Sequence, residues 1–175
     1  MSQGVSMRGS VRDAEFSEYV AGRRAQLRRA AYLLCGDSHR AEDLVQTTLM
    51  KVYVAWPRIR RDGSVEAYAR RVMVNAHVDD TRRPWRRERV GVDGLDIEAR
   101  VASSSEDRDL LLAALADLPP RQRATVVLRH YWGLSVEETA TDLGVSAGTV
   151  KSQTSHALRR LEQALSPHYD ERQGR

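Results

Sequence analysis

The chain has 175 residues, of which 41% are hydrophobic and 30% charged, with a net charge of +4 and one cysteine. No apolar run is long enough to span a bilayer, and the N-terminus "MSQGVSMRGSVRD" lacks the apolar segment of a signal peptide. The lone Cys35 excludes an internal disulfide and a cysteine-built metal site, and it fits the reducing cytoplasm.

Three helices are predicted in the N-terminal half. Apolar residues recur at helical spacing across 16–34, and Gly36 stands where a C-terminal cap belongs. A second helix is expected over 38–56, where Pro57 ends it, and a third over 65–83. No segment alternates apolar and polar residues as a strand would, so the fold class is all-α.

The helical pattern stops over 84–105, a stretch with few apolar residues that contains glycines and a serine run. We interpret it as a flexible acidic linker between two small helical domains, 13–83 and 106–166. Charge changes sign near this boundary, because 57–89 hold ten arginines against five carboxylates and 90–109 hold six carboxylates against two arginines. The excess of positive charge permits a polyanionic partner without requiring one.

The second domain carries the signature of a helix-turn-helix. Ser135 and Glu138 have the spacing of a capping box at the start of a short helix. Gly144 can take the left-handed backbone that a tight turn requires, and Ser146 caps the next helix. Two helices joined by a three-residue turn with a glycine match this DNA-binding motif.

The second helix of the motif has two different sides. The side expected to be buried comprises Val150, Thr154, Ala157, Leu158, Leu161 and Leu165. The opposite side carries small residues and cations, namely Gly148, Thr149, Ser152, Ser155, His156 and Arg159, flanked by Lys151 and Arg160. A solvated face is the alternative for this helix alone. The turn before it and the scarcity of acidic residues favour contact with base edges and phosphates.

The segment 41–56 carries one stripe more than a simple amphipathic helix needs. Its core stripe is Leu44, Val45, Thr48, Leu49, Val52, Ala55 and Trp56. The opposite side carries a second stripe of mixed polarity, Asp43, Gln46, Thr47, Met50 and Val54. Either a partner docks there or another helix of the same domain covers it, and the spacing alone leaves both open.

Three stretches in order resemble a known family: "AEDLVQTTLMKVYVAW", "AYARRVMVNAHVDDTRR" and "LADLPPRQRATVVLRHYWGLSVEETATDLGVSAGTVKSQTSHALRRL". They are similar to the extracytoplasmic-function (ECF) sigma factors, the small sigma-70 proteins with sigma domains 2 and 4 alone. The first stretch most resembles the SigE-like subgroup, and the likeness spans about 13–165. It implies a cytoplasmic protein that directs core RNA polymerase to promoter −10 and −35 elements and helps to melt them, with no catalytic residue, cofactor or metal.

The resemblance assigns residues to three contacts. The set implied for core polymerase, through its largest and second-largest subunits, is Asp43, Leu44, Gln46 and Met50. The set implied for the −10 element is Arg58, Arg60, Arg61, Arg70, Arg71, Asn75 and Arg82, with 58–64 as a loop. The set implied for the −35 element is Ser146, Gly148, Thr149, Lys151, Ser152, Ser155, Arg159 and Arg160. An anti-sigma protein is a further partner that the resemblance allows, and the acidic linker would pass through the polymerase channels.

Two positions depart from the family pattern. Many members have an acidic residue where this chain has Thr47, so docking on polymerase must rest on its neighbours. Many also have arginine where this chain has Gln153, so no −35 contact is assigned there.

Two other classes of protein are less consistent with the residues. A response regulator with a similar C-terminal motif requires alternating strands and helices before it, whereas 13–83 shows only helices. A nuclease could use His77, Asp79 and Asp80, but these residues point to different sides of one helix and do not form a shared metal site.

Overall fold

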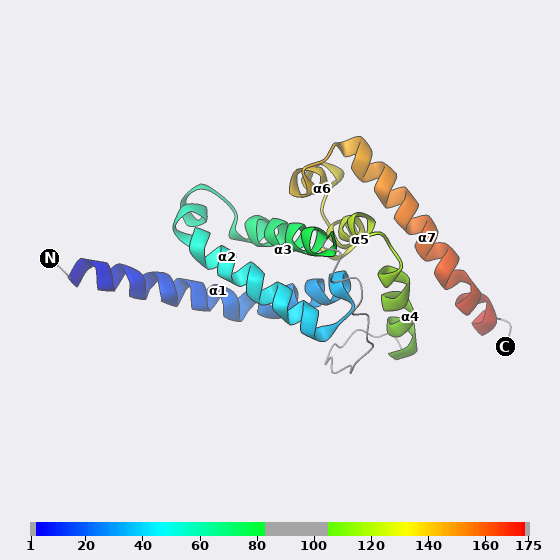
Figure 1. Ribbon diagram of the computed structural model, residues 1–175, viewed down its shortest axis with the longest axis horizontal. Coiled ribbons are helices and arrows are strands. Elements are labelled where there is room, and N and C mark those ends of the chain that lie inside the picture. Colours follow the sequence, from blue (N-terminus) through cyan, green and yellow to red (C-terminus); the bar gives the residue numbers. More distant parts are fainter. Residues whose placement is uncertain (1–2, 83–104, 174–175) are drawn as a thin grey trace.

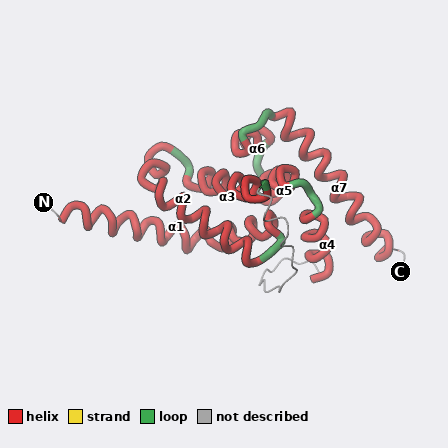
Figure 2. The backbone as a smooth tube through the Cα atoms, in the orientation of Figure 1, coloured by secondary structure: helices red, strands yellow, loops and turns green. Residues whose placement is uncertain are grey.

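The computed structural model describes residues 3–82 and 105–173, which fold into helices joined by short turns, with no strand among them (Figures 1 and 2). The elements are α1 (Gln3–Cys35), α2 (Ser38–Asp62), α3 (Val65–Thr81), α4 (Ser105–Ala116), α5 (Pro120–Val126), the π-helical segment η2 (Val127–Tyr131), α6 (Val136–Leu143) and α7 (Ala147–Gln173). The all-α prediction is confirmed. None of the described helices combines the length and apolar character that a membrane crossing requires.

Helices α1 and α2 lie side by side as an antiparallel pair (Figure 1). Gly36 joins them with a positive φ of 68°, and the side chain of Asp37 caps α2 by accepting from the Arg40 amide at 2.7 Å. Helix α1 begins well before the apolar repeat at 16–34. Asp13 holds this early part of α1 on α2 by accepting a 2.6 Å hydrogen bond from the Tyr53 hydroxyl.

The prediction that Pro57 ends the second helix is wrong, because α2 continues through it to Asp62. A proline inside a helix leaves the carbonyl four residues earlier without its usual donor. Here that carbonyl belongs to Tyr53, and the guanidinium of Arg12 donates to it at 2.5 Å. The expected loop 58–64 is therefore helical except for its last two residues.

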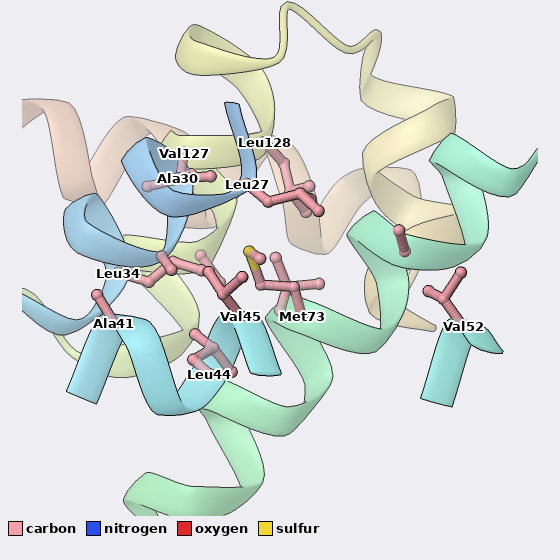
Figure 3. Packing of buried hydrophobic residues seen from close by; sticks show 14 of the residues in the cluster. Leu27, Ala30, Leu34, Ala41, Leu44, Val45, Val52, Met73, Val127 and Leu128 are labelled. Carbon is pink, nitrogen blue, oxygen red and sulfur yellow. The ribbon is translucent and has the colours of Figure 1, made fainter. Parts of the chain in front are cut away.

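One apolar core joins helices from both halves of the chain. Leu34 of α1, Val45 of α2 and Met73 of α3 are fully buried and pack in one cluster with Leu128 of η2 (Figure 3). A second, smaller cluster fills the space between α4, α5 and α7. The two predicted helical units thus pack against each other. The expected linker lies outside the described residues, except that Ser105 already belongs to α4.

The helix-turn-helix has the local geometry that the sequence predicts. Ser135 and Glu138 form both hydrogen bonds of a capping box, and Gly144 ends α6 with a φ of 64°. Ser146 then accepts from the Thr149 amide at 3.1 Å and caps α7. The prediction that Leu158 is buried is wrong, because this side chain is 42% exposed. Helix α7 also runs past Pro167, where a frayed tail was expected.

Candidate functional site

The second stripe of α2 faces solvent. Met50 is 70% exposed and Val54 77%, the two largest exposures among the large apolar side chains that the structure describes. Asp43, Gln46 and Thr47 are exposed beside them. No helix in the described part of the chain covers this stripe, so packing within the chain does not account for it. Leu44, which the resemblance assigns to the polymerase contact, lies in the core as its place in the core stripe predicts, and it is 8% exposed.

A cationic pocket lies where α2 meets α3. Its volume is about 610 Å³, and its lining includes Arg58, Tyr68, Arg71 and Asn75. The guanidinium of Arg58 lies 6.0 Å from the centre of the Tyr68 ring. Three of the predicted −10 residues therefore share one concave surface with an aromatic ring.

Three more of the predicted −10 residues are exposed, and one of them forms an ion pair within the chain. Arg61 and Arg82 are exposed. Arg60 is also exposed, but it pairs with Glu15 of α1 at 2.9 Å. These three cations thus lie exposed near the ends of α2 and α3, outside the lining of the pocket.

Arg70 points to α6 rather than to solvent. Its Nε lies 2.5 Å from a carboxylate oxygen of Asp142, and its side chain is 14% exposed. Nε of Arg71 lies 3.7 Å from the other oxygen of this carboxylate, and the Asn75 amide donates to the Asp142 carbonyl at 3.4 Å. Asp142 is 4% exposed. A single acidic residue of the helix-turn-helix thus engages three predicted −10 residues.

A second polar contact crosses between the halves of the chain at the end of α1. Arg123 of α5 is 6% exposed and donates from Nε to the Leu33 carbonyl at 2.7 Å. Burial lowers the pKa of this guanidinium to about 10. The last carbonyls of a helix lack internal donors and carry its negative dipole end, so a cation is favourable there.

Beside this contact, the buried His77 of α3 lies against the half-buried Cys35 of α1, with Sγ and Nδ1 4.0 Å apart. Burial lowers the pKa of His77 to about 4, assisted by the nearby charges of Arg123 and Arg40. Burial also raises the pKa of the Cys35 thiol to about 11. Within the described residues, no three His, Cys, Asp or Glu side chains are grouped as metal ligands.

The predicted −35 residues lie on the open side of the helix-turn-helix. Those exposed are Ser146, Gly148, Lys151, Ser152, Ser155, Arg159 and Arg160, and Thr149 is half-buried beside its cap. Gln153 turns inward, and its Oε1 accepts from the hydroxyl of the buried Thr125 at 3.0 Å. This inward position agrees with assigning no −35 contact to Gln153.

A helix-turn-helix with an open face, packed on a helical unit with a cationic pocket, is the arrangement of a DNA-binding protein. Residues 20–87 match the family model described as "Sigma-70 region 2", and 108–161 match "Sigma-70, region 4". The chain is 45% identical over 158 residues to the RNA polymerase sigma-E factor of Streptomyces avermitilis, covering 86% of this chain and 85% of the relative. The Streptomyces coelicolor sigma-E factor is 44% identical, covering 86% of each. The chain belongs to the sigma-70 family, in its ECF group.

Solved structures agree with this assignment. The sigma factor RpoE from Bartonella quintana, crystallised in complex with the anti-sigma factor NepR, matches with a TM-score of 0.71 and 28% identity. The match covers 87% of this chain and 97% of RpoE, and so includes both regions. CnrH, solved with the cytosolic domain of CnrY, matches in fold with a TM-score of 0.65, covering 89% of this chain and 90% of CnrH at 22% identity. As a sigma factor, the chain binds core RNA polymerase and promoter DNA and directs transcription initiation.

Proposed function

We propose that three separate surfaces divide this work. The stripe on α2 docks on core polymerase, the α2–α3 pocket with the cations around it takes the −10 element, and the open face of α7 reads the −35 element. Residues 13–83 act as the first domain and 106–166 as the second. The chain itself makes and breaks no covalent bond, and it works in the cytoplasm, where polymerase and the nucleoid are.

The observation that carries this division is the exposure of Met50 and Val54. Two large apolar side chains exposed on one helix face indicate an interaction site, because burying them against a partner is favourable. Asp43 and Gln46 add polar groups along the same stripe, which suits docking of one helix on another. The coiled coil of the largest polymerase subunit, implied by the family resemblance, is the matching partner. Leu44 supports this face from the core rather than contacting polymerase.

The pocket between α2 and α3 suits a single strand with one base turned out. Extruding a base from the duplex costs a few kcal/mol, and stacking on an aromatic ring together with cations along the backbone offsets that cost. Tyr68 offers such a ring, and Arg58 and Arg71 flank it. Arg60, Arg61, Arg70 and Arg82 extend the positive charge along the path of the strand. This gives the chain its means of favouring melted −10 DNA.

The open face of α7 suits a major groove. The recognition helix of a helix-turn-helix places its N-terminal residues against base edges. Gly148 and Ser152 are small enough to let the helix approach closely, and Arg159 reaches further. Contacts to phosphate alone would carry no sequence information, so Ser152, Ser155 and Arg159 are the readers and the flanking Arg160 fixes the register.

Transcription by purified polymerase tests the whole proposal. Core polymerase with this factor and fragmented genomic DNA should yield run-off transcripts that share one −10 and −35 pair upstream of their starts. Core polymerase alone is the control. Transcripts that depend on the factor but share neither element would refute the assignment of the two DNA-binding surfaces.

We also propose that an anti-sigma protein regulates the factor. The support is that the RpoE relative was solved bound to NepR. The test is to purify the factor from its own cells, isolate any stoichiometric complex, and add the partner back to run-off transcription. A partner that leaves transcription unchanged is not an anti-sigma protein.

A further inference from the structure

Pro57 lies inside α2, and part of the α2–α3 pocket is built after it. The helix continues from Pro57 to Asp62, and two residues of this segment, Arg58 and Ile59, line the pocket. A proline removes the hydrogen bond to the carbonyl four residues earlier, and its ring crowds that carbonyl, so a helix tends to kink or break there. The side of the pocket that α2 supplies therefore depends on what keeps this helix intact past the proline.

Arg12 of α1 supplies the missing donor. Its guanidinium donates from Nη2 to the Tyr53 carbonyl at 2.5 Å, which is the carbonyl that Pro57 leaves without a backbone donor. The same guanidinium lies 4.0 Å from the centre of the Tyr53 ring, a cation–π contact that helps to fix its position. A charged donor also makes a stronger hydrogen bond than a neutral one. Arg12 thus compensates for the proline at the carbonyl that the proline exposes.

Two further residues from the same part of α1 hold α2 on both sides of Pro57. Before the proline, Asp13 accepts from the Tyr53 hydroxyl at 2.6 Å. After the proline, Glu15 pairs with Arg60 at 2.9 Å. The early part of α1 lies along this stretch of α2 (Figure 1). The contacts of Arg12 therefore belong to a short brace that spans the weak point of α2.

Arg12 acts on the pocket through α2, because it is not among the residues that line the pocket. Past the proline, the helix carries the Arg58 guanidinium to 6.0 Å from the centre of the Tyr68 ring on α3. Ile59 anchors the same segment in the core and is 6% exposed. A chain whose α2 ended at Pro57 would leave Arg58 in a loop, with no fixed place over that ring.

We infer that Arg12 is a positioning residue for promoter opening, which completes α2 at Pro57 and so holds Arg58 over Tyr68 where an unpaired base is captured. This inference rests on the proposed role of the pocket at the −10 element. Arg12 precedes residue 20, where the match to the region 2 family model begins. The early part of α1 thereby gains a function in the chain's action on the promoter.

Positioning is tested first without DNA, by hydrogen exchange of the amides over 58–63 in the full chain. Arg12→Ala should speed this exchange about tenfold, as expected for the loss of one hydrogen bond from a charged donor. Adding Pro57→Ala should remove most of the increase, because the alanine donates its own N–H to the Tyr53 carbonyl. Arg24→Ala is the matched control, since Arg24 is an exposed α1 arginine that also pairs with α2. Unchanged exchange in Arg12→Ala, or no rescue by Pro57→Ala, overturns the inference.

Promoter opening is tested next, with holoenzyme on the promoter that the factor itself selects in run-off transcription. The rate at which permanganate reactivity appears in the −10 region, followed over a range of holoenzyme concentrations, separates binding from opening. At saturating holoenzyme, Arg12→Ala should open the promoter about tenfold more slowly, because a misplaced capturing group raises the barrier of this step. Adding Pro57→Ala should restore the rate, and slow opening that it does not restore overturns the inference.

A loss of stability alone does not produce this result. A smaller folded fraction of Arg12→Ala raises the concentration of holoenzyme that is needed, without slowing the opening step at saturation.

The two proposals fail separately. Arg58→Ala tests the pocket directly, because Arg58 is assigned to the −10 strand itself. Slow opening with Arg58→Ala but normal opening with Arg12→Ala overturns the inference and leaves the −10 role of the pocket standing. Normal opening with both variants removes the −10 role of the pocket, and this inference with it.

Discussion

Helices α2 and α3 both carry residues assigned to partners of a sigma factor, yet the structure leaves them in opposite states. The stripe on α2 is open, with Met50 and Val54 largely exposed, whereas Arg70 of α3 is covered by Asp142 of α6. Large apolar side chains left open in water favour capture by a protein partner, and a cation paired internally is less available to phosphate. The difference suggests an order of events in which polymerase binds first and promoter DNA second.

A charge placed on the exposed stripe of α2 should weaken its binding to polymerase. Met50→Glu should weaken binding to core polymerase by about a hundredfold or more, because a carboxylate buried in a docked interface costs about 3 kcal/mol or more when unpaired. Fluorescence anisotropy of the labelled factor with core polymerase measures the change. Val11→Glu is the control, since Val11 is an apolar residue of α1 that is 60% exposed. Equal losses in both variants would mean that the stripe is no specific docking face.

Acid should test the packing over α3, because a buried histidine there makes the free energy of unfolding depend on pH. His77 lies under the same packing, and its pKa is lowered to about 4 from 6.5, chiefly by burial. Between these values the unfolded chain binds more protons than the folded chain, so the free energy of unfolding falls as pH drops from 6.5 to 4, by up to about 3 kcal/mol.

Urea unfolding across this pH range measures the effect. His77→Gln should remove most of the slope, whereas His39→Gln, at an exposed position, should keep it. A wild-type slope in His77→Gln would show that other groups cause the acid sensitivity.

The open face of α7 offers a third comparison, within one helix. Arg159→Ala should change base preference at particular −35 positions by about 1–3 kcal/mol, because it faces outward where base edges are reached. Arg160→Ala should weaken binding to all sequences and reduce the salt dependence, as loss of a phosphate contact does. Selection from a randomised −35 element by each holoenzyme separates these outcomes. Identical motifs and relative affinities for wild type and both variants would refute readout by this helix.

The smallest effect should come from the cap of α6, the helix that covers α3. Ser135→Ala removes one half of the capping box and should lower the free energy of unfolding by about 1 kcal/mol. The backbone N–H of Ser135, which the variant keeps, is the main cause of the lowered pKa of Glu138, and the Ser135 side chain adds to it, so that pKa should rise only slightly in the variant. Chemical denaturation and carboxyl NMR titration measure the two changes. Ser166→Ala, near the far end of α7, is the control, and an equal loss there would mean that the cap has no special role.

The features that the sequence predicts well depend on residues close together in the chain. The capping box at Ser135, the turn at Gly144 and the cap at Ser146 depend on residues within three or four positions of each other. The two stripes of α2 follow from helical periodicity alone. These features need no knowledge of distant contacts.

Distant partners explain what the sequence predicts poorly. The helix continues through Pro57 because Arg12, forty-one positions from Tyr53, satisfies the freed carbonyl. Asp142 gives no periodic signal, and its partner Arg70 is seventy-two positions away. The buried position of Arg123 likewise depends on a distant partner, the Leu33 carbonyl at the end of α1. Family membership could be predicted because its motifs are local, whereas the closed packing could not.

Energy transfer between dyes on the two regions tests the central claim most directly. Dyes at Glu18→Cys in α1 and Gln163→Cys in α7, both exposed positions, with Cys35→Ala, would report the separation of the regions. We predict high transfer in the free chain, no change when duplex DNA carrying the selected promoter is added alone, and a large drop when core polymerase is added. Low transfer in the free chain, or high transfer that persists in the polymerase complex, would contradict the account.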